Sequence, residues 1–128
     1  MRKSKNLAKW DLTVLLSKKI LQFFENLNFF SRFYRVDVSS RSDCFATVAS
    51  VASDFGKIHH LVNCVAYFGS QSLEATESDW EKTMSVNVAG SSFMVQAVVD
   101  QMKGYSLSEN CSVVNISSIS AHQTQPNR

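Results

Sequence analysis

The fold of this chain is decided by one stretch, Ser112-Val113-Val114-Asn115-Ile116-Ser117-Ser118. A short β-branched run that ends in hydroxyl side chains is typical of a buried parallel strand whose carboxyl end opens on a ligand crevice. Two segments precede it, Leu61-Val62-Asn63 and Val86-Asn87-Val88-Ala89-Gly90. The carboxyl ends of parallel strands meet at one edge of a sheet, so the polar residues after the strands should lie along one crevice.

Strand and helix patterns alternate along the chain. Strands are predicted near residues 33–36, 58–63 and 112–117. Helical spacing of apolar residues predicts helices over 45–55, which Gly56 ends, and over 84–102. A third helix should begin after Thr76, with Asp79 completing a capping box. This alternation indicates an α/β fold with a parallel sheet of about three strands, a partial doubly wound, Rossmann-like arrangement.

The N-terminal part differs from the rest. Residues 1–36 carry a net charge of +6 and the remainder −4. Apolar residues at helical spacing predict an extra amphipathic helix over 12–30, with Asp11 as its N-cap. We therefore divide the chain into a basic helical segment at 1–32 and a domain at 33–128. The helix can face the core, or it can bind a membrane surface or a partner.

Composition excludes several classes of function. The net charge of +2 is too small to indicate nucleic-acid binding, and no apolar segment reaches the roughly 18 residues of a membrane span. The three cysteines form no C-x-x-C pair and the three histidines lack metal-ligand spacing, so we expect no metal site. His59 is expected in solvent. Free thiols indicate a reduced compartment, and we predict a cytoplasmic protein, with a mitochondrial location left open by the basic N-terminus.

Three motifs resemble those of the short-chain dehydrogenase/reductase family. Val86–Gly90 is similar to the family's Val-Asn-x-x-Gly, and Asn115–Ser118 to its Asn-Ile-Ser-Ser. Asn63-Cys64-Val65-Ala66 stands where the family typically has Asn-Asn-Ala-Gly. The resemblance runs from about Tyr34 to Arg128 and implies an NAD- or NADP-dependent oxidoreductase that acts on a small alcohol or carbonyl substrate.

The resemblance also implies roles for five residues. Ser118 would be the catalytic serine that hydrogen-bonds the substrate oxygen. Asn87 would hold a water that links the active site to a catalytic lysine. Asp37 and Val38 would contact the adenine ring of the cofactor, and Asn63 would lie on the cofactor side.

Each of these roles has a structural alternative. Asp37 can cap the turn that follows it, and one residue can do both. Asn87 can satisfy backbone groups of its own helix. A pair of serines at a strand end is also typical of turns.

Two family motifs are missing from these residues. The tyrosines Tyr34, Tyr67 and Tyr105 have no lysine four positions on, so no Tyr-x-x-x-Lys occurs. The four glycines form no glycine-rich turn for a pyrophosphate. We therefore expect a truncated domain that is inactive alone. The alternatives are a non-catalytic interaction module that forms a homo-oligomer through the helix at 84–102, and a membrane-surface protein held by its N-terminal helix.

Overall fold

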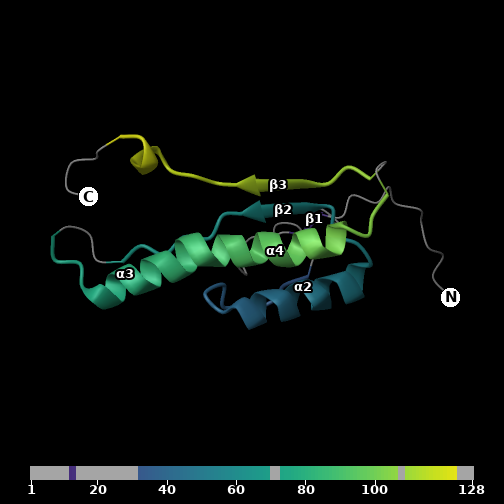
Figure 1. The fold of residues 1–128 in the computed structure, drawn as a ribbon, viewed down its shortest axis with the longest axis horizontal. Coiled ribbons are helices and arrows are strands. Elements are labelled where there is room, and N and C mark those ends of the chain that lie inside the picture. Colours follow the sequence, from purple (N-terminus) through teal and green to yellow (C-terminus); the bar gives the residue numbers. More distant parts are fainter. Residues whose placement is uncertain (1–11, 14–31, 70–72, 107–108, 124–128) are drawn as a thin grey trace.

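The computed structural model describes residues 12–13, 32–69, 73–106 and 109–123, and shows an α/β arrangement (Figure 1). The strands are β1 (Leu12–Thr13), β2 (His60–Asn63) and β3 (Ser112–Asn115). The helices are α2 (Arg41–Phe55), α3 (Glu77–Met84) and α4 (Ser91–Met102), with a π-helical segment η1 (Ser85–Gly90) and a short 3-10 turn η2 (Ile119–Ala121). All three strands are parallel, in the order β1-β2-β3. The predicted α/β class and the parallel pairing of the last two strands are confirmed.

Local sequence signals set the ends of the helices. Ser40 caps α2, because its side chain accepts a hydrogen bond from the Asp43 amide. Gly56 ends α2 at φ +87°, a left-handed conformation that glycine adopts without strain. The capping box predicted for α3 is present, with Thr76 and Asp79 bonding each other's backbone amides.

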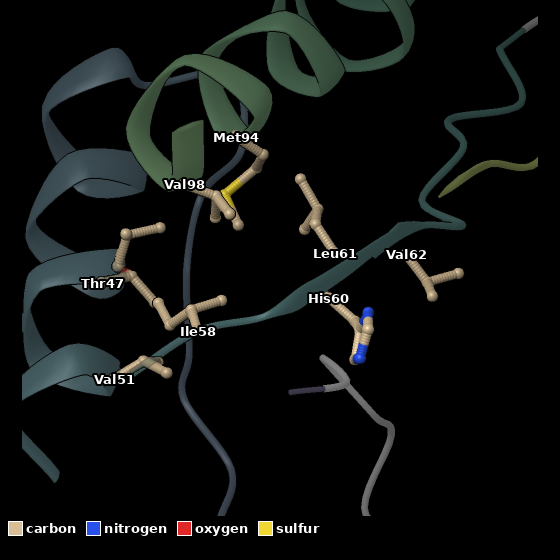
Figure 2. Close-up of a pocket in the computed structure, with 9 residues that line it drawn as sticks. Thr47, Val51, Ile58, His60, Leu61, Val62, Met94 and Val98 are labelled. Carbon is tan, nitrogen blue, oxygen red and sulfur yellow. The ribbon is translucent and has the colours of Figure 1, made fainter. Parts of the chain in front are cut away.

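The core lies between the sheet and a layer formed by α2 and α4 (Figure 1). Its buried side chains come from the turn before α2, from α2 itself, from β2 with its approach, and from α4: Val38, Cys44, Val48, Val51, Ile58, Leu61, Met94, Ala97 and Val98. A small apolar cavity of about 20 Å³ remains between these elements (Figure 2). Ligand pockets have volumes of about 300–1,000 Å³, so this cavity is a packing defect and not a binding site.

The first predicted strand is wrong. Residues 33–36 form no strand but run as extended chain beside α2, where Tyr34 donates a hydrogen bond to Asp54 (2.5 Å) and Arg32 pairs with the same carboxylate. The edge of β2 is instead taken by β1, so Leu12 and Thr13 lie in a strand and not in the predicted helix. Residues 33–36 could form a strand only by pairing with a free edge of the sheet, and β1 already occupies this edge of β2. The rest of the predicted helix, 14–30, lies outside the described residues.

The last strand is less buried than its sequence indicates. Val113 is half-buried, but Val114 is 44% exposed and Ile116 is 56% exposed. The reason is position, because β3 lies at the end of the strand order, and the helical layer contacts the sheet through α4 and β2 while α2 packs mainly on α4. Within the described residues no further strand pairs with β3, so the prediction of a buried strand is wrong for this part of the chain.

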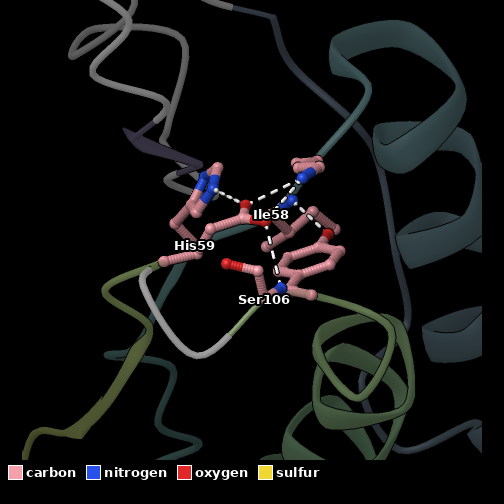
Figure 3. A network of polar contacts seen from close by, with 6 residues as sticks. Ile58, His59 and Ser106 are labelled. Carbon is pink, nitrogen blue, oxygen red and sulfur yellow. Dashed lines mark hydrogen bonds and ion pairs between the residues drawn. The ribbon is translucent and has the colours of Figure 1, made fainter.

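A polar network ties the start of β2 to the loop before β3 (Figure 3). The Glu109 carboxylate accepts two hydrogen bonds from Lys57 (2.7 and 2.8 Å) and lies 3.1 Å from His59 Nε2. It also accepts the Ser106 amide, at 3.2 Å. His59 is therefore paired and only 23% exposed, which corrects its predicted place in solvent. The bonds from Lys57, then those from His59 and Ser106, lower the pKa of Glu109 from 4.5 to about 2.

This network should make the stability of the protein depend on pH below about 4.5. The depressed pKa of Glu109 means that its contribution is fully present above 4.5 and is lost as the pH falls towards about 2. Glu109→Gln should therefore lower the free energy of unfolding at pH 7, and the difference from wild type should shrink at low pH. Denaturant unfolding at a series of pH values measures this. Glu81→Gln removes the same charge from an exposed site on α3 and serves as the control. Equal behaviour of the two variants would contradict the assignment.

Candidate functional site

The carboxyl ends of β2 and β3 form one edge of the sheet. The two strands are in register, with Asn63 opposite Asn115, and the Ile116 amide donates to the Asn63 carbonyl at 2.9 Å. The chain then continues from each strand at the same edge, towards Tyr67 after β2 and towards Ser118 after β3. In open α/β sheets this edge is where ligands bind.

Asn63 joins three elements at this edge. Its side-chain NH2 donates to the Asn115 side-chain oxygen at 2.9 Å and to the Ser91 backbone oxygen at 3.3 Å. Ser91 is the first residue of α4. Asn63 therefore links β2 to β3 and to the start of α4, and its proposed place on the cofactor side remains a prediction.

Asn87 lies in the π-helical segment η1 and is bonded to the loop after β2. Its Oδ1 accepts the Tyr67 amide at 2.7 Å and its Nδ2 donates to the Tyr67 carbonyl at 3.0 Å. The structural alternative for Asn87 is therefore confirmed in part. The Asn87 side chain satisfies backbone groups, but they belong to the loop at Tyr67 and not to its own helix. Single-turn π segments occur often at functional sites. Because both ends of the amide are engaged, a water at the side chain would have to share these bonds.

The turn at Asp37 and Val38 packs against the end of η1. Val38 is buried, and a Cβ built on Gly90 would lie 2.9 Å from the Val38 backbone oxygen. The Asp37 carboxylate accepts from the Ser39 hydroxyl (2.7 Å) and amide (3.0 Å), and these bonds lower its pKa. The turn-capping interpretation of Asp37 is confirmed. Contact of Asp37 and Val38 with adenine remains a prediction, and Asp37 does not follow a strand.

Ser118 stands three residues beyond β3 and is the N-cap of η2. Its Oγ accepts the Ser120 amide at 3.2 Å, and its side chain is exposed. The turn interpretation of this serine is therefore also confirmed. A hydroxyl that accepts one hydrogen bond keeps its own proton for another partner, so the cap leaves Ser118 able to donate to a ligand oxygen.

Lys82 is a residue of this region that the sequence did not single out. Its Nζ lies 4.8 Å from the centre of the Tyr67 ring, a cation–π distance, and its charge also lowers the pKa of Asp37. The contact joins α3 to the loop after β2, fifteen positions apart, and no local spacing rule would reveal it. Asn115 was missed for the same reason.

The described residues contain no glycine-rich cradle for the pyrophosphate of a dinucleotide. Each of the four glycines has another place: Gly56 ends α2, Gly69 faces Tyr67 and Asp79, Gly90 packs on Val38, and Gly104 follows α4. None of them opens a helix after a strand, as a pyrophosphate cradle requires. In the described ranges no group of three or more His, Cys, Asp or Glu could hold a metal ion, and no helix is long and apolar enough to cross a membrane.

Comparison with known proteins identifies the lineage of this fold. The family model described as enoyl-(acyl carrier protein) reductase matches residues 5–128. A 3-oxoacyl-[acyl-carrier protein] reductase from Brucella melitensis superposes with a TM-score of 0.77 at 29% identity, over 91% of this chain and 49% of that one. An NAD+-bound xylitol dehydrogenase gives 0.75 at 28% identity, over 86% and 42%.

Curated relatives agree with this lineage. The short chain dehydrogenase tazN of Aspergillus terreus is 27% identical over 94 residues, which are 72% of this chain and 21% of the relative. A diacetyl reductase ((S)-acetoin forming) of Staphylococcus aureus is 34% identical over 70 residues, 54% of this chain and 27% of the relative. The fold defines the class, a Rossmann-like α/β protein. The chain belongs to the short-chain dehydrogenase/reductase family. It spans about a quarter of these curated relatives and less than half of the solved ones.

Proposed function

We propose that this chain carries part of the active site of an NAD- or NADP-dependent oxidoreductase that acts on an alcohol or carbonyl substrate. The observation that supports this most is the convergence at one sheet edge of Asn63, the loop at Tyr67, Asn87 in η1, and the segment that leads to Ser118. Two of the solved relatives hold NAD, the xylitol dehydrogenase and a 3-oxoacyl-[acyl-carrier protein] reductase from Brucella melitensis.

The residues divide between two tasks in this proposal. Ser118 donates a hydrogen bond from its hydroxyl to the substrate oxygen, and the Ser120 amide keeps the hydroxyl oriented. Asn87 holds the loop at Tyr67 against η1 and so shapes the wall of the crevice. Asp37 and Val38 lie on the adenine side, where the Asp37 carboxylate is exposed and ionised.

We propose further that these 128 residues are inactive alone. They contain no Tyr-x-x-x-Lys to transfer a proton, and their glycines form no cradle for the pyrophosphate. General acid–base catalysis is typically worth about 10²–10⁴-fold, and neither Ser118 nor Asn87 ionises usefully near neutral pH.

The test is a paired measurement on the 128-residue chain. NADH and NADPH are titrated by fluorescence, and hydride transfer is then assayed on a panel of alcohols and ketones. We expect no saturable binding below about 1 mM, which corresponds to about −4 kcal/mol, and no turnover. Micromolar binding with turnover that Ser118→Ala abolishes would overturn inactivity and support the catalytic serine. Turnover that survives Ser118→Ala would overturn the role of Ser118.

One observation favours the alternative of a non-catalytic module. Trp80, Met84 and Val88 recur every fourth residue along α3 and η1 and are 63%, 51% and 53% exposed. Such a stripe suits self-association through the helix at 84–102, with Trp80 of α3 extending the surface. Sedimentation of the same sample tests this alternative: a self-associating module sediments as an oligomer, and Met84→Lys should convert it to a monomer.

Membrane attachment through the N-terminus rests on residues outside the described ranges, and vesicle flotation tests it. A cytoplasmic location likewise stays a prediction.

A further inference from the structure

We propose that Asn115 is a positioning residue of the candidate active site. Its side-chain oxygen, bonded to Asn63, holds the point at which the chain leaves β3 on its way to Ser118. The inference deepens the proposed function and rests on it, because the position of Ser118 matters for chemistry only if Ser118 faces a substrate. Asn115 lies inside the stretch that decides the fold, but the sequence predicts no functional role for it.

The first observation is that side-chain hydrogen bonds join β2 and β3 at both ends of their ladder. The two strands share four residue pairs, from His60 and Ser112 to Asn63 and Asn115. The side chains of both end pairs are hydrogen-bonded to each other, at 2.9 Å in each case. The two central pairs are apolar. Cross-strand pairs of this kind stabilise a short ladder and fix its register.

The second observation is what lies behind the pair at the carboxyl end. The Asn63 NH2 has two protons, and it donates to both Asn115 and the Ser91 carbonyl. The Ser91 hydroxyl in turn donates to the Asn87 carbonyl at 3.3 Å. A chain of hydrogen bonds thus runs from Asn115 through Asn63 and Ser91 to Asn87. It links the two sides of the candidate site, the segment of Ser118 and the π-helical segment.

The third observation is that the segment beyond Asn115 has few other supports. Its side chains are exposed from Ile116 to Ser118. In the described part of the chain, three hydrogen bonds fix it: the Ile116 amide to the Asn63 carbonyl, the Ser120 amide to Ser118 Oγ, and the Ala121 amide to the Ser118 carbonyl at 3.0 Å. Loss of the Asn115 bond should therefore be felt first at the Ile116 amide, which follows Asn115 directly, and at the Ser120 amide, which the Ser118 side chain accepts.

Hydrogen-exchange NMR on the full 128-residue chain tests the proposal. Asn115→Leu removes the acceptor, and we expect exchange of the Ile116 and Ser120 amides to rise about threefold to tenfold, in line with one lost hydrogen bond. Exchange of the Val98 amide, in the buried face of α4, reports global unfolding and should rise less. Asn115→Asp keeps an acceptor oxygen and should stay close to wild type. If the leucine variant does not fold, Asn115→Ala removes the same acceptor with less bulk.

Ser112→Ala is the matched control, because it removes the side-chain bond at the other end of the same ladder. It should leave the Ile116 and Ser120 amides unchanged relative to Val98. The proposal is overturned if Asn115→Leu or Asn115→Ala leaves the exchange rates of the Ile116 and Ser120 amides unchanged, or raises them no more than that of the Val98 amide. It is also overturned if Asn115→Asp or Ser112→Ala raises the exchange of the Ile116 and Ser120 amides by the same factor. The exchange measurement involves no cofactor, so its result does not depend on the NADH and NADPH titration. Either the proposed function or the role of Asn115 can therefore fail while the other stands.

Discussion

Gly90→Ala should destabilise the protein by about 1–3 kcal/mol, the usual cost of overpacking a core. Its new Cβ would lie 2.9 Å from the Val38 backbone oxygen and 3.1 Å from two atoms of the Val38 side chain. Alanine in place of glycine within a helix normally stabilises by up to about 1 kcal/mol, so the sign of the effect alone is diagnostic. Thermal or denaturant unfolding measures it.

Gly104→Ala is the control for this prediction, since a Cβ there meets its nearest atom, the Gln101 carbonyl oxygen, only at 3.9 Å. It should be close to neutral. Val38→Ala combined with Gly90→Ala should recover only part of the loss, because the shortest contact is with backbone. A neutral or stabilising Gly90→Ala would mean that η1 does not pack on the turn at Val38, and Asp37 and Val38 would lose their contact with the candidate site.

Asn87→Leu should also cost about 1–2 kcal/mol, the lower part of the penalty for unpaired polar groups, because Asn87 and Tyr67 are half-buried. The substitution removes both hydrogen bonds to Tyr67, whose amide and carbonyl are then left beside an apolar side chain. We expect lower stability together with faster exchange of the Tyr67 amide. Both are measurable on the same sample, by denaturant unfolding and by hydrogen-exchange NMR.

Ser92→Ala provides the comparison for Asn87→Leu. The Ser92 hydroxyl donates to the Val88 carbonyl at 3.0 Å from an exposed position, and exposed substitutions usually stay within about ±0.5 kcal/mol. If the two variants behave alike, Asn87 is an ordinary helix residue. The proposed wall of the crevice would then lose its support.

The described helices follow from the sequence because their signals are local. Ser40 and Gly56 bound α2, and Thr76 with Asp79 begins α3, since caps act between residues a few positions apart. The predicted helix at 84–102 is present, although its first part is π-helical. The parallel pairing of β2 and β3 follows from the helix between them, which a parallel connection requires.

The shared edge of the candidate site could be predicted for the same reason. Asn63 closes β2 and Ser118 follows β3, and parallel strands in register bring their carboxyl ends together. Asp37 follows no strand and reaches this region only through the contact of Val38 with Gly90.

What the sequence could not reveal is which groups meet across space. The neighbour of β2 is β1 and not residues 33–36, because a β-prone segment forms a strand only where an edge is free. The exposure of β3 depends on its place in the strand order, which no periodicity encodes. His59 pairs with Glu109, fifty positions away, and Asn63 with Asn115, fifty-two away. By itself the sequence determined the helices, the parallel strands and the polar edge, since these depend on neighbours along the chain. The hydrogen-bond partners at that edge were decided by the tertiary structure, because a polar side chain takes whichever group packing brings within about 3 Å.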